Sequence, residues 1–208
     1  MYMKSSVNLI DIFNSTDIRQ HTPLLALQGT LYWITGLAGA GKSTIGRRLY
    51  ERLKEQKPNV VFLDGDVLRN IFANPLGHSL DDRKTLALIY SNLCRMLVDQ
   101  QIDVVCATMS LFKEVHSYNR KHMRRYYEIF VDCQIEELIR RDQKGIYSSA
   151  TSGQLQHVVG IDIPYDRPEN CDLVIDNTAK DNLESKVDRI ISLSVANTPQ
   201  AGDEHATW

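Results

Sequence analysis

The amino-acid sequence predicts an α/β domain built on a mostly parallel, five-stranded sheet. Short apolar runs rich in β-branched and aromatic residues alternate along the chain with longer stretches of helical periodicity. Runs that are apolar throughout are typical of strands covered on both faces, and alternation of strands with helices is typical of parallel sheets. The expected strands span residues 31–35, 60–63, 104–107, 127–131 and 173–175, and the expected helices span about 42–56, 82–101, 113–125, 134–142 and 181–194.

The first expected strand leads into a glycine-rich segment. This segment, Gly36-Leu-Ala-Gly-Ala-Gly-Lys-Ser-Thr44, fits the pattern G-x-x-x-x-G-K-[ST]. After it, Ile45, Leu49 and Leu53 recur at four-residue spacing, which predicts an amphipathic helix. A strand, a glycine-rich turn and a helix start form the context in which this pattern binds nucleotide phosphates. The alternative is a glycine-rich turn that binds nothing, and the flanking strand and helix argue against it.

The chemistry expected of this phosphate loop follows from its backbone. Its glycines let successive N–H groups point at one place, and the helix that begins near Lys42 directs its positive dipole end there. Lys42 adds a full charge toward the β- and γ-phosphates, and the hydroxyl of Ser43 is a ligand for Mg²⁺. The sequence therefore predicts an ATP-using enzyme of the three-layer P-loop NTPase type, with ATP-binding residues Gly36, Leu37, Ala38, Gly39, Ala40, Gly41, Lys42, Ser43 and Thr44.

Two acidic residues follow the second expected strand. Asp64 and Asp66 are separated by one glycine, and Arg69 comes one helical turn later. At this sheet edge, the carboxylates would hold Mg²⁺ through water or accept a proton from an acceptor hydroxyl. The alternative is a turn in which Asp66 caps a helix. Arg69 would bind an anionic acceptor, or else take part in an ordinary surface ion pair.

Composition limits the class of protein. At 208 residues and 43% hydrophobic composition, the chain suits one domain with a large core. The net charge of −2, with Lys and Arg spread along the chain, predicts no nucleic-acid partner and no anionic-membrane surface. No apolar segment approaches membrane-spanning length, so we expect a cytoplasmic protein that makes no membrane contact.

The cysteines and histidines form no recognisable metal motif. The cysteines lie far apart without a C-x-x-C pair, which predicts neither a zinc site nor a disulfide framework; they are Cys94, Cys106, Cys133 and Cys171. Six histidines include no H-E-x-x-H motif. His116 and His122 lie on an expected helix rich in Lys and Arg, and we expect both to be exposed.

Residues 144–163 carry three glycines among Ser, Thr and Gln, between a helix and the last strand. We expect a lid that closes over substrates and excludes water. The alternative is an ordinary surface loop.

Taken in order, these motifs and several later ones resemble the adenylylsulfate kinase (APS kinase) family over roughly residues 30–176. The matching segments are Gly36–Thr44, Leu63-Asp-Gly-Asp-x-x-Arg69, Asp82-Arg-Lys84, Ser110, Arg141-Asp-x-Lys-Gly-x-Tyr147, Gly160-Ile-Asp162 and Pro168-Glu-Asn170. The family phosphorylates the 3′-hydroxyl of adenosine 5′-phosphosulfate (APS) with MgATP, usually as a dimer. The resemblance therefore implies a P-loop kinase domain, which we place at 29–195. Residues 1–28 show no clear period and are expected to form an extension, and the polar composition of 196–208 predicts a disordered tail.

The resemblance also implies roles for individual residues. Lys42, Asp64 and Asp66 would be catalytic, with Ser43 and Asp64 at the metal, and Arg141 would lie near the adenine of ATP. The acceptor-binding residues would be Asp66, Arg69, His78, Arg83, Met109, Ser110, Lys144 and Val158. Ser110 matches a serine that is phosphorylated in some members, although a serine after a strand is more often a hydrogen-bonding turn residue.

The chain departs from the family pattern on the acceptor side. His78 and Val158 replace two phenylalanines expected to stack on the acceptor adenine, and valine has no aromatic face. Leu86 replaces an asparagine, which removes an amide, and Lys113 replaces an arginine, which removes a planar fork.

From the resemblance as a whole, we expect an ATP-dependent kinase of the 3′-hydroxyl of APS that yields the 3′-phosphorylated product (PAPS) and ADP in sulfate assimilation. Two alternatives are a kinase of another 5′-substituted nucleotide, such as cytidine diphosphoramidate, and a nucleotide-binding subunit without turnover.

Overall fold

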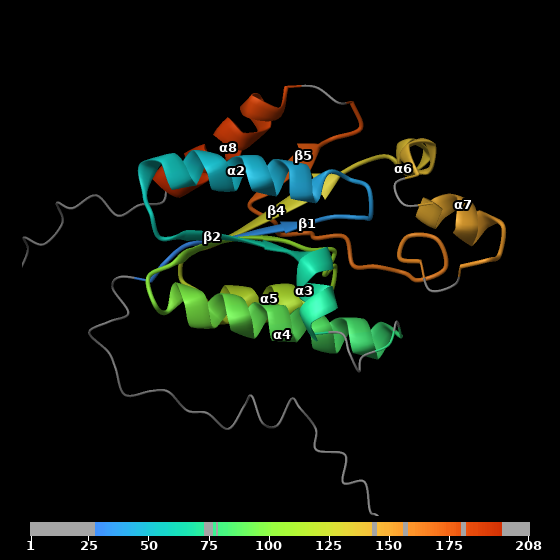
Figure 1. The fold of residues 1–208 in the computed structure, drawn as a ribbon, viewed down its shortest axis with the longest axis horizontal. Helices are drawn as coiled ribbons and strands as arrows, with labels where there is room; N and C mark the ends of the chain where they lie inside the picture. Colours follow the sequence, from blue (N-terminus) through green and yellow to red (C-terminus); the bar gives the residue numbers. More distant parts are fainter. Residues whose placement is uncertain are drawn as a thin grey trace, which may run out of the picture.

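Five parallel strands form the centre of the molecule. The computed structural model describes residues 28–72, 77, 79–142, 145–155, 158–179 and 182–196. The strands are β1 (Leu31–Thr35), β2 (Val60–Asp64), β3 (Asp103–Ala107), β4 (Tyr126–Asp132) and β5 (Leu173–Asp176). Their order across the sheet is β2-β3-β1-β4-β5, and each pair of neighbours is parallel (Figure 1). The predicted fold class is confirmed.

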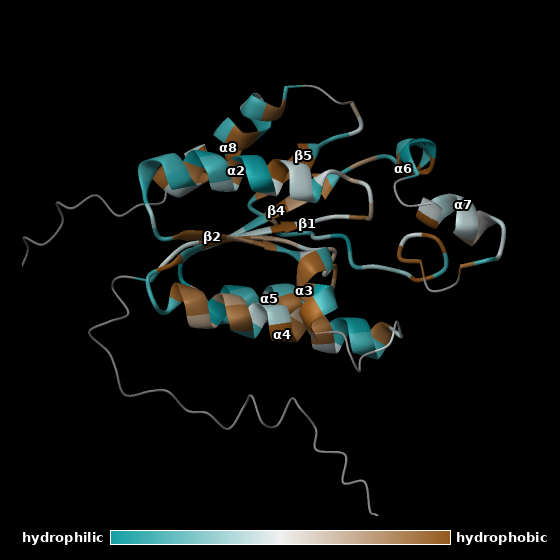
Figure 2. Ribbon diagram, viewed as in Figure 1, coloured by the Kyte–Doolittle hydropathy of each residue, from teal (hydrophilic) through white to brown (hydrophobic). Residues whose placement is uncertain are grey.

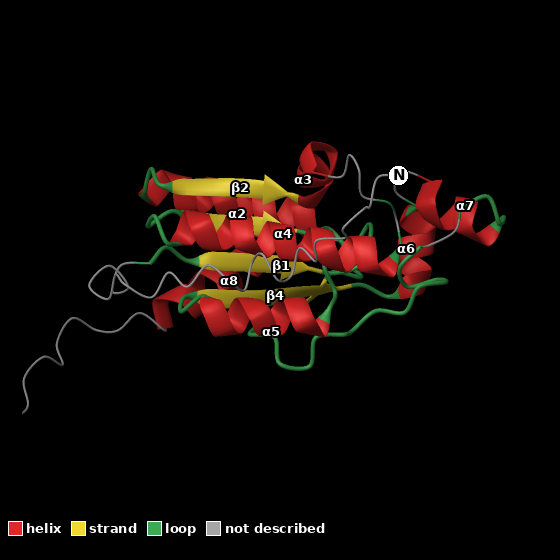
Figure 3. Ribbon diagram, turned by 90° about the horizontal axis from the view of Figure 1, so that it is seen from below, coloured by secondary structure: helices red, strands yellow, loops and turns green. Residues whose placement is uncertain are grey.

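Helices cover both faces of this sheet. On one face lie α2 (Lys42–Gln56) and α8 (Leu183–Ala196); on the other lie α3 (Gly65–Phe72), α4 (Leu80–Val98) and α5 (Lys113–His122) (Figure 1). Two short helices, α6 (Ile135–Arg141) and α7 (Ile146–Thr151), lie beyond the carboxyl ends of the strands (Figures 1 and 3). The expected N-terminal extension and the expected tail, apart from Gln28 and Ala196, lie outside the described residues.

The strand residues of β1 supply both halves of the core. Tyr32 and Ile34 point into the cluster under α2 and α8, while Leu31 and Trp33 point into the cluster under α4 and α5. This alternation follows from the two-residue period of a strand. All four side chains are at most 1% exposed, which explains why the run reads as apolar throughout. Figure 2 shows the hydrophobic strands between helices, with mostly hydrophilic residues on the outer surface of α2.

A side-chain capping box sets the start of helix α4, which periodicity alone did not locate. Helix α4 begins at Leu80, two residues before the expected start, because Ser79 and Asp82 form a capping box. Asp82 N–H donates to Ser79 Oγ at 3.2 Å, and Ser79 N–H donates to Asp82 Oδ2 at 3.2 Å. Helix α7 lies inside the expected lid, where the sequence predicted no helix.

His116 is buried, and the expectation that it is exposed was wrong. Only 8% of it is accessible, and it lies on the buried face of α5 with Val115 and Asn119. The many Lys and Arg residues of this helix lie on its other faces, so composition misrepresented a single position. His122, one turn and a half later, is partly exposed.

In the part of the chain that the structure describes, no helix is both long and apolar enough to cross a membrane.

Candidate active site

A cavity of about 750 Å³ lies at the carboxyl ends of β1, β2 and β3. The segments that follow these three strands line it, together with one face of α4 and the segment around α7. Ligands of open α/β sheets bind at this edge, because the loops after parallel strands all gather there. The cavity is therefore the candidate active site.

The phosphate loop forms one wall of the cavity. Gly36 has a φ of 151°, and a Cβ atom there would lie 2.3 Å from the carbonyl oxygen of Val131. Gly41 has a φ of 104° and immediately precedes α2, whose N-terminus has no side-chain cap. The first N–H groups of α2 and its positive dipole end therefore face the cavity. Lys42 Nζ donates to the carbonyl oxygen of Leu37 at 2.7 Å, which places its charge at the loop.

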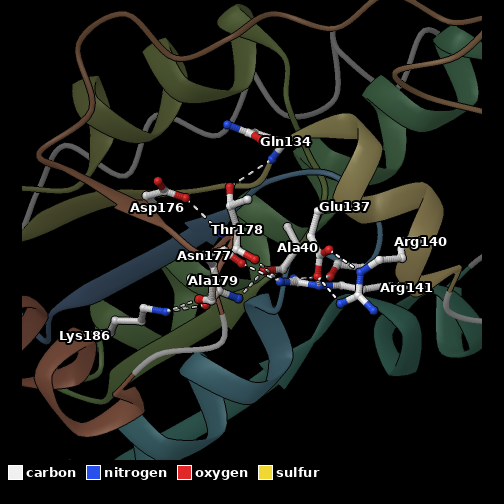
Figure 4. Close-up of polar contacts among 11 residues, drawn as sticks. Ala40, Gln134, Glu137, Arg140, Arg141, Asp176, Asn177, Thr178, Ala179 and Lys186 are labelled. Carbon is white, nitrogen blue, oxygen red and sulfur yellow. Dashed lines mark hydrogen bonds and ion pairs between the residues drawn. The ribbon is translucent and has the colours of Figure 1, made fainter.

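A partly buried polar network supports the phosphate loop (Figure 4). Asn177, directly after β5, donates from Nδ2 to the carbonyl oxygen of Ala40 at 2.6 Å. Lys186 of α8 donates from Nζ to Asn177 Oδ1 at 2.6 Å, and Lys186 is only 5% exposed. A Cβ atom on Gly41 would lie 2.3 Å from Asn177 Nδ2, so the loop and the amide pack closely. No sequence pattern marked this network, because its members come from three separate elements.

Arg141 belongs to the same support (Figure 4). Its guanidinium donates to the carbonyl oxygens of Asn177 at 2.6 Å, Thr178 at 2.9 Å and Gly39 at 3.4 Å. It also pairs with Glu137 at 2.8 Å, and its side chain is 5% exposed. The hydrogen bonds of Arg140 and Arg141 lower the pKa of the Glu137 carboxyl to about 2. Arg141 is not among the residues that line the cavity, so its contact with the adenine of ATP stays a prediction.

The acidic pair lines the same cavity as the phosphate loop. Asp64 and Asp66 come from the end of β2 and the start of α3, and Lys42 and Ser43 from the start of α2. The N–H of Asp66 donates to Asp64 Oδ1 at 2.9 Å, so the carboxylate that caps the turn into α3 is that of Asp64 rather than that of Asp66. One oxygen of Asp64 thus shapes the turn. The turn and the functional interpretations are therefore compatible.

Two arginines that we expect to bind the acceptor come from different elements and line the same cavity. Arg69 of α3 and Arg83 of α4 both line the cavity, and Arg69 Nη2 also donates to the carbonyl oxygen of Gly77 at 2.8 Å. Burial, and then the charge of Arg69, lower the pKa of the Arg83 guanidinium. Two guanidiniums held close together in a half-buried space favour the binding of an anion.

The other residues expected to bind the acceptor divide into two groups. Met109, Ser110 and Val158 line the cavity. His78 and Lys144 lie outside the described residues. Ser110 Oγ lies 2.9 Å from Thr108 Oγ1, as expected of a hydrogen-bonding turn residue.

The cavity also has an apolar wall, of which sequence reasoning had singled out Leu86 alone. Leu86, Ala87 and Tyr90 of α4 line it one and two turns after Arg83, and Phe112 lines it from the segment after β3. The helical spacing of positions 83, 86, 87 and 90 was the available signal, because it places them on one face. Tyr90 and Phe112 supply aromatic rings in a cavity that lacks the family's phenylalanine at position 158.

The expected lid covers part of this cavity. The segment lines it with Ile146, Gly153, Gln154, Leu155, Val158 and Val159. Tyr147 is 1% exposed and donates its hydroxyl to the carbonyl oxygen of Ala38 at 2.8 Å. The lid segment is thus hydrogen-bonded to the phosphate loop. Its closure over substrates stays a prediction.

The all-parallel sheet, the phosphate loop and the cavity at the strand ends define a P-loop kinase. A family model described as adenylylsulphate kinase matches residues 28–176, so the chain belongs to the adenylylsulphate kinase family.

Individual relatives agree with this family and differ in their named substrates. The chain is 48% identical over 164 residues to a cytidine diphosphoramidate kinase of Campylobacter jejuni, which covers 77% of this chain and 94% of the relative. It is 34% identical over 194 residues to an adenylyl-sulfate kinase of Clostridium acetobutylicum, which covers 92% of this chain and 96% of the relative. The structure of the Mycobacterium tuberculosis APS kinase in complex with AMPPNP and APS matches with a TM-score of 0.74 at 32% identity, covering 80% of this chain and 97% of that one.

Proposed function

We propose that the protein transfers the γ-phosphoryl group of ATP to a hydroxyl of a 5′-substituted nucleotide, and that this acceptor is cytidine diphosphoramidate. The observation that carries the choice of acceptor is the 48% identity to a cytidine diphosphoramidate kinase, against 34% to an adenylyl-sulfate kinase. Both relatives are covered over more than nine tenths of their length. The resemblance to the first therefore spans donor and acceptor sides together.

The cavity supports a two-substrate transfer. The phosphate loop and the N-terminus of α2 would hold the ATP phosphates on one wall, and Lys42 would neutralise charge on the transferring group. Asp64 and Asp66 line the same cavity, where one of them would accept the proton of the attacking hydroxyl. Transfer in line between two such walls requires positioning and charge neutralisation more than covalent catalysis.

The acceptor side supports an anionic nucleotide with a changed base pocket. Arg69 and Arg83 would hold the acidic 5′-substituent, because their neighbouring charges favour an anion between them. Leu86 and Val158 give the same cavity aliphatic surface where the family pattern has an amide and an aromatic ring. A site with these replacements would accept a different base from that of APS.

Magnesium fits the donors present. The hydroxyl of Ser43 and the carboxylate of Asp64 line one cavity, and both are oxygen ligands of the kind Mg²⁺ prefers. Within the described ranges, no group of three or more His, Cys, Asp or Glu residues could hold a metal unaided. We propose that Ser43 and Asp64 hold Mg²⁺ together with the nucleotide phosphates. When bound, the ion would supply positive charge to the phosphate oxygens.

APS is the second candidate acceptor. The family model and the 34% identical relative both carry the adenylylsulfate name, and Asp66, Arg69, Arg83 and Ser110 of the family pattern all line the cavity. A role in sulfate assimilation depends on this acceptor. The homodimer and the cytoplasmic location also stay predictions. The named activities of the relatives favour a kinase over a binding subunit without turnover.

A direct competition would test the proposal. The purified protein would receive MgATP and equal concentrations of cytidine diphosphoramidate and APS, and mass spectrometry would follow both phosphorylated products. We expect cytidine diphosphoramidate to be the better substrate, with a kcat/KM at least about tenfold higher, the discrimination that a single good contact supplies. Preferential phosphorylation of APS would overturn the acceptor assignment in favour of the second candidate. The Lys42→Ala variant provides the background rate.

A further inference from the structure

The buried ring of His116 lies between two oxygen atoms. Its Nε2 is 2.8 Å from the carbonyl oxygen of Ser110, and its Nδ1 is 3.0 Å from Glu128 Oε1. His116 comes from α5, Ser110 from the segment after β3, and Glu128 from the middle of β4. The ring therefore joins a cavity-lining loop to the central sheet.

Both of these neighbours accept hydrogen bonds. A carbonyl oxygen has no proton to give, and an ionised carboxylate accepts only. A neutral imidazole carries one N–H, which would leave a nitrogen lone pair facing an oxygen lone pair at hydrogen-bonding distance. The arrangement is satisfied when both ring nitrogens donate, that is, when His116 is an imidazolium.

The surroundings of Glu128 favour the ionised form of its carboxyl group. Its side chain is only 4% exposed, and burial alone would raise its pKa. The hydrogen bonds and charges of His116, Arg120 and Tyr126 together outweigh burial, and the pKa of Glu128 lies below its ordinary value. Arg120 at 3.3 Å and the hydroxyl of Tyr126 at 3.2 Å also donate to Glu128 Oε2.

Other charges surround this pair without replacing it. Arg120 also binds Asp172 at 3.1 Å, which shares its charge between two acids. On the side of α4, Lys84 pairs with Glu114 at 2.9 Å, so that the two charges compensate each other near His116. Arg120 thus contacts Glu128 Oε2, while His116 contacts the other carboxylate oxygen, Oε1.

We infer that His116 is a positioning residue, a buried imidazolium paired with Glu128 that fixes the carbonyl group of Ser110 and thereby the acceptor wall of the cavity. Strand β3 has ended at Ala107 and α5 has not begun before Lys113. The segment between them contributes Thr108, Met109, Ser110, Leu111 and Phe112 to the cavity lining. His116 anchors the middle of this segment to the sheet through an ionic hydrogen bond, which is stronger than a neutral one.

Nuclear magnetic resonance tests the charge of the ring directly and needs no substrate. Two-bond ¹H–¹⁵N correlations of the full chain, assigned with the His116→Gln variant, distinguish an imidazolium from either neutral tautomer. We expect the His116 signals to show both nitrogens protonated at neutral pH. A neutral tautomer at neutral pH would overturn the inference.

Steady-state kinetics test the positioning role, and only this part rests on the proposed function. We expect His116→Gln to raise the KM for the acceptor about tenfold, the effect of losing one charged hydrogen bond, while the KM for ATP changes less than about twofold. His116→Arg, which retains a cation with several donors, should recover most of the loss. His122→Gln, on the same helix, should change neither KM. Equal changes in both KM values, or no recovery with arginine, would contradict the assignment. Absence of transfer by the unaltered protein would instead refute the proposed function.

Discussion

The side-chain amide of Asn177 donates to the carbonyl oxygen of Ala40 at 2.6 Å, which ties the end of β5 to the middle of the phosphate loop. The amide oxygen of Asn177, Oδ1, accepts a hydrogen bond from Lys186 Nζ of α8 at 2.6 Å. The amide orientation is therefore fixed from both sides. A buried lysine of the last helix thus stabilises the loop expected to hold ATP, and no sequence motif marked it.

We predict that Asn177→Ala raises the KM for ATP about tenfold and lowers the free energy of unfolding by about 1–3 kcal/mol. The variant removes the bond to Ala40 and one acceptor of a buried ammonium group, and an unsatisfied buried polar group costs this much. ATP kinetics and urea unfolding would measure the two effects. Asn182→Ala is the matched control, because the side chain of Asn182 accepts from the N–H groups of Glu184 and Ser185 at the start of α8. An ATP KM that rises equally in both variants would contradict a specific role for Asn177.

Lys42→Ala should lower the rate of transfer by at least about 100-fold, because the variant loses electrostatic stabilisation of the transferring phosphoryl group. The fold should survive, since the hydrogen bond of Lys42 to the carbonyl oxygen of Leu37 lies within a single loop. Initial rates of ADP formation, with circular dichroism as the fold check, would measure this. Lys54→Ala, on the exposed side of the same helix, should keep full activity. Near-normal turnover of Lys42→Ala would show that the donor site is misassigned.

Gly36→Ala should destabilise the protein by more than about 2 kcal/mol. The φ of 151° belongs to a region that costs other residues about 1–3 kcal/mol, and the added Cβ atom would also meet the carbonyl oxygen of Val131. Gly153→Ala is the comparison, since Gly153 has a φ of 73° but open space around its Cα atom. It should cost only about 1–2 kcal/mol, the backbone penalty alone. Equal losses in chemical denaturation would show that close packing at Gly36 contributes nothing.

Arg83→Met should weaken acceptor binding without weakening the fold. Burial and the charge of Arg69 disfavour the Arg83 cation while the charge of Asp162 favours it, so an apolar side chain of similar length should change the melting temperature little. The KM for the acceptor should rise about 10–100-fold, because a charged hydrogen bond to the anion is lost. Arg95→Met, at the far end of α4 beside Asp99, should leave acceptor binding unaffected. A large drop in the melting temperature of Arg83→Met would mean that Arg83 is structural.

The stability contribution of Glu137 should disappear in acid. Hydrogen bonds from Arg140 and Arg141 lower its pKa from 4.5 to about 2. A depressed carboxyl pKa stabilises the folded state above pH 4.5, and this contribution is lost as the pH falls toward 2. The difference in unfolding free energy between the unaltered protein and Glu137→Gln should therefore shrink over that interval. A difference independent of pH would contradict the ion pair, and Glu136→Gln on the exposed neighbouring position serves as the control.

The architecture was largely predictable from local patterns. The five strands read as apolar runs, and the phosphate loop carried its own spacing. The carboxylates Asp64 and Asp66 could be placed beside that loop because parallel strands end at one edge of a sheet. Helix α7 was missed because its six residues, Ile146–Thr151, are too few and too polar to show a period.

Contacts between distant segments were not predictable in the same way. Asn177, Lys186 and His116 each act through a partner on another element, and nothing adjacent in sequence announces the pairing. Arg141 shows the same limit, because its neighbours 177 and 178 join it only in the folded chain. Sequence patterns indicate which residues share a face of one helix or strand. They do not indicate the group on another element to which each of these four residues bonds.

The most direct test of the proposed activity is to follow the transferred phosphoryl group by its phosphorus signal. In ³¹P nuclear magnetic resonance of the protein with MgATP and cytidine diphosphoramidate, the γ-phosphorus signal of ATP should decline while one phosphomonoester signal appears on the acceptor. The account predicts one ADP formed for each phosphorylated acceptor. Formation of inorganic phosphate alone, at the same rate with and without any nucleotide acceptor, would contradict it.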